Sequence, residues 1–249
     1  MSLRKSLQSL SILPGVVLPG LLSFASLPPQ LSAQSYPDGR LSLTFPPTQN
    51  RGAPGRTIGG GTRSPSCLGI DDTSLTALMP EDNLGLTVSA NPAFFFYVPK
   101  ATETLAELSA EFTVSDEEFK EIYHTNFTLV NTPGVVKVQL PKTVSLEIGK
   151  TYHWEFAIIC DPQDPERDQF VWGQSQRVEL SPELKANLKQ VLLLEQAKLY
   201  AHRQIWHETL SILAELYSSN PKEWEELLNS VGLQDIAKKP LVECCTVEK

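Results

Sequence analysis

Apolar and polar residues alternate with a period of two through the middle of the chain, and this pattern predicts β-strands that have one buried face. It is clearest in residues 108–114, 136–140, 152–160 and 170–180, and a shorter candidate lies at 127–130. Alternation of this kind is typical of strands that cover a hydrophobic core on one side. Proline and glycine cluster between these runs, as expected for turns in all-β proteins.

One apolar run has no alternation and predicts a strand that is buried on both faces. Residues 94–98 read Phe-Phe-Phe-Tyr-Val between Pro92 and Pro99, which predicts a central strand. The count of predicted strands is six or seven, with no long helix between them. The pattern therefore predicts a mainly β fold, an antiparallel β-sandwich of immunoglobulin or fibronectin type III kind over residues 67–180.

The spacing of apolar residues changes to a helical period after residue 180, which predicts a helical C-terminal region over residues 181–249. Ser181 followed by Pro182 is a typical helix start. The first helix is predicted to run on to Leu199. A second helix carries Trp206 to Tyr217 and a short third helix carries Trp224 to Val231.

The first two predicted helices are similar in spacing to a single tetratricopeptide repeat. One such repeat cannot bury a core alone, so the hairpin must pack on the sandwich or on another chain. We consider two roles for its aromatic residues, contact with a partner or docking of the helices on the sheet. The predicted partner-binding residues are Trp206, Tyr217 and Trp224.

The N-terminus has the pattern of a secretory signal peptide over residues 1–33. A basic start is followed by the uncharged apolar run 10–24, which prolines and glycines make too interrupted for a membrane-spanning helix. Cleavage is predicted between Ala33 and Gln34. A second cut near Ala25 and an uncleaved anchor are the alternatives. Residues 34–66 then predict a flexible Pro/Gly-rich arm.

Export would place the four cysteines in an oxidising compartment, periplasmic or extracellular. Four cysteines allow three pairings. We favour Cys67 with Cys160, because Cys160 lies on the core-facing side of its predicted strand. Cys244 and Cys245 would then join as neighbours or await a partner. A zinc site is the alternative, although the sequence has no C-x-x-C pair.

Several short stretches have a distinctive combined pattern: Gly55-Arg-Thr-Ile-Gly-Gly-Gly-Thr-Arg63, Phe94-Phe-Phe-Tyr-Val-Pro99, Gly149-Lys-Thr-Tyr-His-Trp154, Ile159-Cys-Asp-Pro162 and Leu241-Val-Glu-Cys-Cys245. Together they resemble an uncharacterised, mainly cyanobacterial exported family, the domain of unknown function numbered 928. The likeness covers nearly all of the chain after the signal peptide. It implies an exported protein and brings no established functional residues with it.

Charge argues against one class of partner. The net charge is −8, and removal of residues 1–33 takes away Arg4 and Lys5 but no acid, leaving 19 basic against 29 acidic residues. Nucleic-acid binding draws much of its affinity from basic residues that neutralise phosphates, so it is not expected here. After cleavage no segment predicts a membrane span. We expect another envelope or secreted protein as partner.

An acidic loop is the candidate metal site. Hard oxygen ligands this close in sequence favour Ca²⁺, although the spacing is not that of an EF-hand. A solvated hairpin loop is the alternative. The candidate ligands are Asp161, Asp164, Glu166 and Asp168.

No enzyme signature accompanies these features. The four histidines occur without G-x-S-x-G or H-E-x-x-H, and no cofactor motif is present. Trp154, Trp172 and the phenylalanine run either line a sugar-binding face or fill the core. The sequence therefore favours an exported, non-catalytic protein-interaction module. Carbohydrate or calcium binding is the alternative function, and a hydrolase the next.

Overall fold

The computed structural model describes residues 43–47, 67–69, 73–102, 108–243 and 246–247. The predicted signal peptide, its cleavage site and most of the predicted flexible arm lie outside these residues. Within the described residues, no helix is long and apolar enough to span a membrane.

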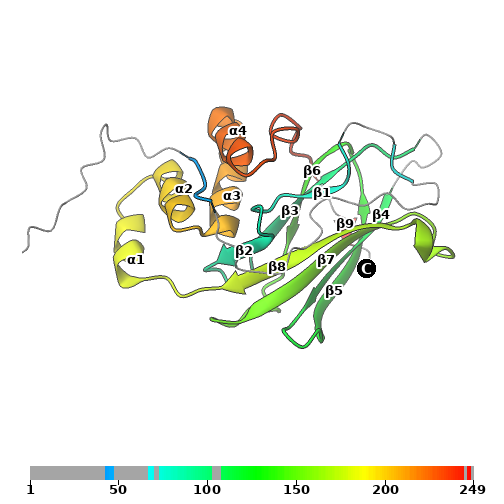
Figure 1. The fold of residues 1–249 in the computed structure, drawn as a ribbon, viewed down its shortest axis with the longest axis horizontal. Coiled ribbons are helices and arrows are strands. Elements are labelled where there is room, and N and C mark those ends of the chain that lie inside the picture. Colours follow the sequence, from blue (N-terminus) through cyan, green and yellow to red (C-terminus); the bar gives the residue numbers. More distant parts are fainter. Residues whose placement is uncertain (1–42, 48–66, 70–72, 103–107, 244–245, 248–249) are drawn as a thin grey trace, which may run out of the picture. The chain divides into compact units, whose positions relative to one another are not determined.

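The fold is mainly β, with two sheets (Figure 1). The strands of the small sheet, in spatial order, are β1 (Thr76–Ala77), β3 (Ala93–Val98) and β6 (Gly134–Gln139). Those of the large sheet are β2 (Leu84–Thr87), β8 (Gln169–Arg177), β7 (Thr151–Ile159), β4 (Leu108–Ser115), β5 (Glu121–Leu129) and β9 (Thr246–Val247). The predicted mainly β class with a helical C-terminal region is confirmed.

One strand pair departs from the predicted antiparallel arrangement. β2 runs parallel to β8, with Leu84 opposite Gln174 and Thr87 opposite Arg177. The other strand pairs among the described residues are antiparallel. The paired residues are 90 positions apart in the sequence, and a local pattern of alternation does not show the direction of so distant a partner strand. The immunoglobulin or fibronectin topology stays a prediction.

Strand β3 is buried on both faces, as its continuous apolar run predicts. Phe96 stacks on Phe156 of the large sheet, with ring centroids 4.1 Å apart. Phe95 points the other way, toward Trp224 of the helical region, at a centroid distance of 6.4 Å. The small sheet therefore lies between the large sheet and the helices, and this middle position explains why β3 has no polar face.

The C-terminal region holds four helices instead of the predicted three: α1 (Pro182–Leu188), α2 (Leu193–His202), α3 (Trp206–Glu215) and α4 (Pro221–Ser230). The expected start is confirmed, since the Ser181 side chain accepts a hydrogen bond from the Leu184 amide. The predicted first helix breaks between α1 and α2. There the Gln196 side chain donates to the carbonyls of Leu188 and Val191, which satisfies groups that the break exposes.

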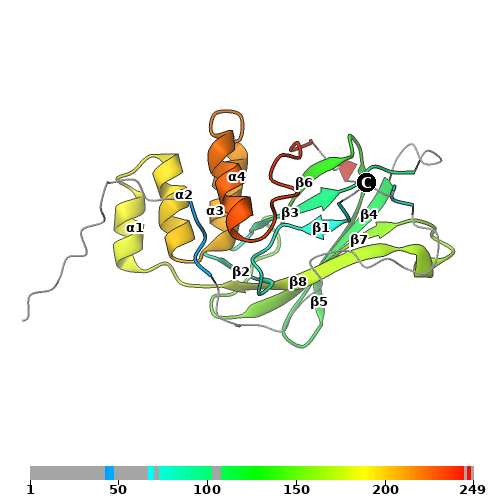
Figure 2. The same ribbon diagram turned by 45° about the horizontal axis from the view of Figure 1, so that its top comes forward.

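Part of the predicted flexible arm is packed. Leu43 and Phe45 are buried, and the Phe45 amide donates to the Ser230 hydroxyl at the end of α4. The Phe45 ring also meets Trp206 of α3 edge-on, with centroids 5.0 Å apart. Residues 43–47 therefore run along the helices, which lie beside β2 and β3 (Figure 2). The expectation of a loose arm is wrong for this segment, because its alternating apolar residues find a surface to cover.

Candidate functional site

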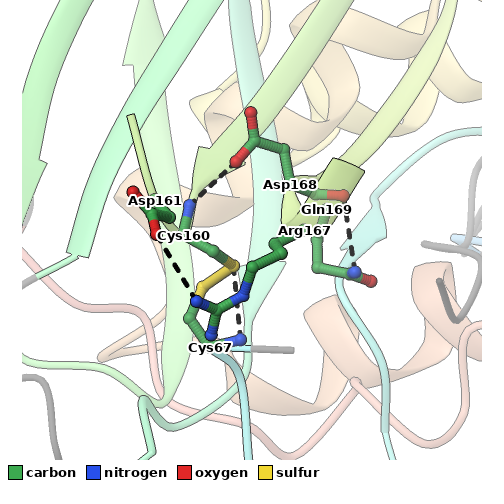
Figure 3. The surroundings of a disulfide bond; sticks show 6 residues. All are labelled: Cys67, Cys160, Asp161, Arg167, Asp168 and Gln169. Carbon is green, nitrogen blue, oxygen red and sulfur yellow. Dashed lines mark hydrogen bonds and ion pairs between the residues drawn. A yellow bond between two sulfur atoms is a disulfide. The ribbon is translucent and has the colours of Figure 1, made fainter. Parts of the chain in front are cut away.

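The predicted disulfide between Cys67 and Cys160 is confirmed, with the Cα atoms 5.2 Å apart (Figure 3). It joins the segment before β1 to the residue that follows β7. These two sulfurs are bonded to each other, so they are not zinc ligands. Cys244 and Cys245 lie outside the described residues.

The acidic loop between β7 and β8 uses its carboxylates locally (Figure 3). The Asp161 carboxylate lies 3.6 Å from the Arg167 guanidinium, and the Asp168 carboxylate accepts from the Cys160 amide at 2.9 Å. In the described part of the chain, no group of three or more His, Cys, Asp or Glu side chains is placed to hold a metal ion. The described residues therefore do not assemble the calcium site predicted from Asp161, Asp164, Glu166 and Asp168.

The aromatic residues of the helices dock them on the sheet. Trp206 and Trp224 are each 0% exposed. The Trp206 indole donates to the Leu78 carbonyl at 2.9 Å, and the half-buried Tyr217 meets Trp224 edge-on at 5.8 Å. A fully buried ring has no surface to offer a partner. The prediction that Trp206 and Trp224 bind a partner is therefore wrong. Both are core residues that dock the helices on the sheet, which was the alternative role.

A different set of aromatic residues faces solvent, on the side of the large sheet that is turned away from the small one. They line a groove of about 500 Å³. Phe119, at the tip of the β4–β5 hairpin, is 72% exposed, and its ring stacks on His153 of β7 at 4.1 Å. Phe170 and Trp172 of β8 contribute the other rings. These three rings are not part of the hydrophobic core, so we take this aromatic groove as the candidate site.

Polar side chains lie among these rings, and the strand register sets their positions. Glu155 of β7 is directly opposite Trp172 on β8 and opposite Thr113 on β4. His153 is opposite Gln174 in the next row of the same face. Opposed residues of this kind have Cβ atoms about 4.5–5.5 Å apart. The groove therefore combines flat apolar surfaces with hydrogen-bonding groups at van der Waals range.

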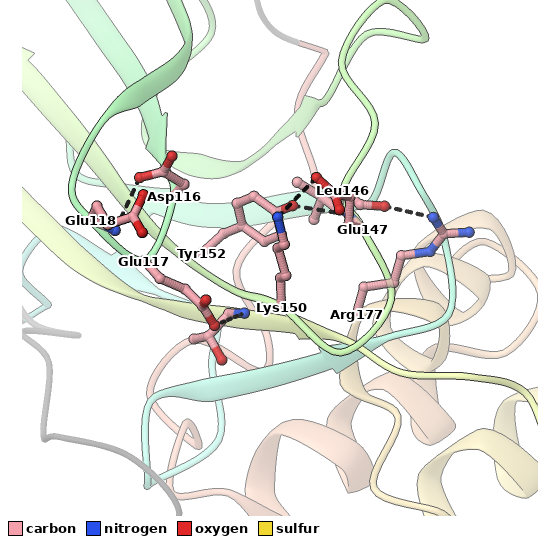
Figure 4. Close-up of polar contacts among 9 residues, drawn as sticks. Asp116, Glu117, Glu118, Leu146, Glu147, Lys150, Tyr152 and Arg177 are labelled. Atoms are coloured by element: carbon pink, nitrogen blue, oxygen red, sulfur yellow. Dashed lines mark hydrogen bonds and ion pairs between the residues drawn. The ribbon is translucent and has the colours of Figure 1, made fainter.

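The hairpin that carries Phe119 is held in a specific conformation. Phe119 has φ of 61°, in the left-handed region that costs a residue with a side chain about 1–2 kcal/mol. The Asp116 carboxylate accepts from the Lys120 amide at 2.9 Å, and the Glu117 carboxylate accepts from the Thr151 amide of β7 at 3.1 Å. Figure 4 shows Asp116 and Glu117 together at this hairpin. These bonds fix the loop so that the ring stays over His153.

Glu155 is the acidic group of the groove, and its environment disfavours the charged form. Although the side chain is exposed, partial desolvation raises its pKa above the ordinary value, and the negative charge of Glu111 raises it further. Glu111 pairs with Ala157, so it is the diagonal neighbour of Glu155 on the same face. Neither Lys nor Arg occurs among the described residues that line the groove.

A second group of perturbed residues joins α3 to the sheets. His207 is 2% exposed; its Nδ1 lies 2.9 Å from the Ala93 carbonyl and its Nε2 lies 2.8 Å from the Ser175 hydroxyl. Because a carbonyl only accepts, Nδ1 carries the proton and Nε2 accepts from Ser175. Burial lowers the pKa of His207 to about 4. The ring is a neutral packing residue whose two nitrogens both have hydrogen-bond partners.

Glu208 binds the chain that follows β2. Its Oε1 accepts from the Thr87 hydroxyl at 2.7 Å and from the amides of Val88 and Ser89 at 3.1 and 2.9 Å. Burial raises its pKa. Ser175 beside His207 is itself fully buried, and a backbone carbonyl stands where a catalytic triad would hold a carboxylate. This cluster therefore fixes the position of the helices.

Sequence reasoning found Trp172 but missed Phe119 and Glu155. Trp172 was grouped with Trp154, which is buried on the opposite face. The signals were present: Phe119 is a single aromatic residue within an acidic turn, and Phe170 and Trp172 are in phase with Gln174. Which phase of β8 faces solvent became clear only from the tertiary structure.

Comparison with known proteins places the chain in a family. A comparison with curated proteins gave no match. The model of the family described as Domain of Unknown Function (DUF928) matches residues 58–241, a range that holds the disulfide, β1 to β8, the aromatic groove and the four helices. Since this match spans well over half of the sequence, the chain belongs to the DUF928 family.

Proposed function

We propose that this protein is an exported, non-catalytic module that binds glycans in the aromatic groove. The observation that carries the proposal is the pairing of the 72% exposed Phe119 ring with the half-buried Trp172 ring on the outer side of the sheet, beside polar groups. Sugar rings have apolar C–H faces that stack on aromatic rings, and their hydroxyl groups need hydrogen-bonding partners at the edges. Gln174 and Thr113 lie where such partners are needed.

The groove supports a glycan better than the helices support a protein partner. The predicted protein-interaction role rested on Trp206, Tyr217 and Trp224, and both tryptophans are buried against the sheets. The similarity of α2 and α3 to a tetratricopeptide repeat stays a prediction and carries no part of the proposal. A protein partner is therefore treated as an alternative outcome of the test.

Two observations support a non-catalytic role. The Ser175–His207 pair is buried and lacks a carboxylate partner, as described above. Glu155 and Glu111 lie on an open sheet face, whereas glycosidases hold their two carboxylates across an enclosed scissile bond. We expect glycan to be bound and released unchanged, and chromatography of the ligand after long incubation would test this directly.

Export is supported by the Cys67–Cys160 disulfide, because such bonds persist in oxidising compartments. Together with the predicted signal peptide, it suggests that the groove would meet glycans outside the cytoplasm, in the periplasm or beyond the cell.

The test is retention of residues 34–249 on a broad glycan array and on insoluble polysaccharides. Trp172→Ala is the informative variant, because it removes the ring at the centre of the groove. Leu192→Ala is the control, since Leu192 is 82% exposed in the helical region and would contribute to any non-specific apolar adhesion.

We expect wild-type protein and Leu192→Ala to bind the same glycans, and Trp172→Ala to lose at least about tenfold in affinity. Retention on no glycan, or equal retention of all three proteins, would overturn the proposal. Capture of a protein through the same groove, lost in Trp172→Ala, would assign the surface to a protein partner instead.

A further inference from the structure

We propose that the aromatic groove selects glycans that carry a protonated amine, such as those with free glucosamine units, and that Glu155 receives the amine. This inference rests on the proposed function and names the class of glycan. The arrangement behind it is a carboxylate beside aromatic rings, and both the negative charge and the faces of the rings attract an organic cation.

The position of Glu155 is the first support. It stands opposite Trp172 across β7 and β8, and two residues along β7 from His153, on which Phe119 stacks. A sugar ring that rests on Trp172 would therefore hold its substituents close to the carboxylate. An ammonium group there would donate charge-assisted hydrogen bonds to Glu155 while its own charge faces the aromatic rings.

The charges around the groove are the second support. The outer face of β4 adds Glu111 next to Glu155, and the hairpin below Phe119 carries Asp116, Glu117 and Glu118 against Lys120. The surrounding field is therefore negative, and it attracts cations and repels acidic sugars such as uronic acids.

The environment of Glu155 is the third support. The Glu155 side chain is exposed on the outer face, but the atoms packed around it remove part of its solvation and Glu111 adds a like charge, and both effects raise its pKa. A cationic ligand would replace the missing solvation with an opposite charge. A neutral sugar would not, so the amine should distinguish the two ligands.

The experiment compares three hexasaccharides with the same β-1,4 gluco-configured backbone that differ only at C2. One bears a free amine, one an N-acetyl group and one a hydroxyl. Binding to residues 34–249 is measured by calorimetry at a pH at which the amine is protonated. The test variant is Glu155→Gln, which keeps the shape and removes the charge. The matched control is Glu118→Gln, which removes one charge from the exposed hairpin loop.

We expect the amine hexamer to bind about tenfold more tightly than the hydroxyl hexamer. This preference should disappear in Glu155→Gln and persist in Glu118→Gln. The affinity for the two uncharged hexamers should be similar in the wild type and in both variants. Equal binding of the amine and hydroxyl hexamers would overturn the inference and leave the proposed function standing. So would a preference that survives in Glu155→Gln, because it would reflect the general field. Failure of all three hexamers to bind would overturn the inference, and an empty glycan array would then remove the proposed function as well.

Discussion

The two faces of the large sheet are built from the same strands but differ in the burial and polarity of their side chains. On β7 the inward residues Tyr152, Trp154, Phe156 and Ile158 are all buried against the small sheet. The outward residues of the same strand include His153 and Glu155, and those of β8 include Phe170 and Trp172. The inward residues of β7 are all aromatic or aliphatic, while the outer face mixes rings with polar and charged groups.

This difference separates the aromatic residues that fill the core from those on the solvent side of the sheet. Burial of an aromatic side chain is a sufficient reason for its presence on the inner face. On the outer side, the 72% exposed Phe119 ring gains little from folding, and its backbone even adopts an unfavourable conformation. The comparison therefore assigns stability to the inner face and recognition to the outer face, and each assignment can be tested.

The largest expected effect on stability comes from a comparison of two alanine substitutions, one at Trp154 on the inner face and one at Trp172 on the outer face. Trp154→Ala should lower the free energy of unfolding by about 3–5 kcal/mol, because it empties a filled site against Gly173 of β8. Trp172→Ala should lower it by about 1 kcal/mol or less, yet weaken glycan binding at least about tenfold. Denaturant unfolding of both variants measures this difference. Similar losses of stability would contradict the assignment of stability to the inner face alone.

The disulfide is expected to contribute almost as much as the inner tryptophan, without touching the aromatic groove. Cys67 and Cys160 are 93 residues apart, and a cross-link over such a loop stabilises by about 4.6 kcal/mol in the chain-entropy account. The double variant Cys67→Ser, Cys160→Ser should unfold at lower denaturant concentration but, where folded, bind glycan with unchanged affinity. A folded variant that loses binding would show that the bond also shapes the groove.

The sequence predicts most of the inner face and little of the outer one. Alternation in residues 108–114 and 152–160 identifies strands and their buried phase, because burial acts on every second residue. The run at 94–98 identifies the strand between two layers. The parallel partner of β2 could not be predicted, because pairing direction depends on distant segments. The break between α1 and α2 could not be predicted either, because the side chain that hydrogen-bonds to its free carbonyls is Gln196, which lies within α2.

The candidate site shows the same limit. Trp154 and Trp172 both read as aromatic residues in strands, and only the packing of the two sheets shows that one is core and the other is not. Phe119 and Glu155 are far apart in the sequence and line the same groove only because of the register of β4, β5 and β7. A surface assembled across strands has no local period, so residue patterns do not reveal it.

A comparison of two histidines should give a smaller effect that depends on pH. His207 is buried against Ser175 on the inner face, and its pKa falls from 6.5 to about 4. Between these values the unfolded chain binds a proton that the folded chain does not. The stabilising contribution of His207 is therefore complete above pH 6.5 and is lost as the pH falls toward 4, by about 3 kcal/mol in total.

The measurement is the free energy of unfolding against pH for His207→Gln and for His153→Gln, the outer-face control. Gln can keep both hydrogen bonds of His207 without titrating, so the slope between pH 6.5 and 4 should flatten in that variant alone. The buried Glu208 has a raised pKa and hence the opposite sign, but it is common to all three proteins. An unchanged slope in His207→Gln would show that the ring is not held neutral.

The smallest effect on stability, and a sharp one on binding, is expected at Phe119. Both Phe119→Gly and Phe119→Ala remove the ring that stacks on His153, so both should weaken glycan binding alike. They should differ in stability by about 1 kcal/mol in favour of glycine, because only glycine adopts a φ of 61° without steric cost. Relative to the wild type, Phe119→Gly should lie within about 1 kcal/mol, since the lost ring contact offsets the relieved backbone. If both variants bind glycan as tightly as the wild type, the exposed ring is not part of the recognition surface, and the outer face must recognise its ligand through β7 and β8 alone.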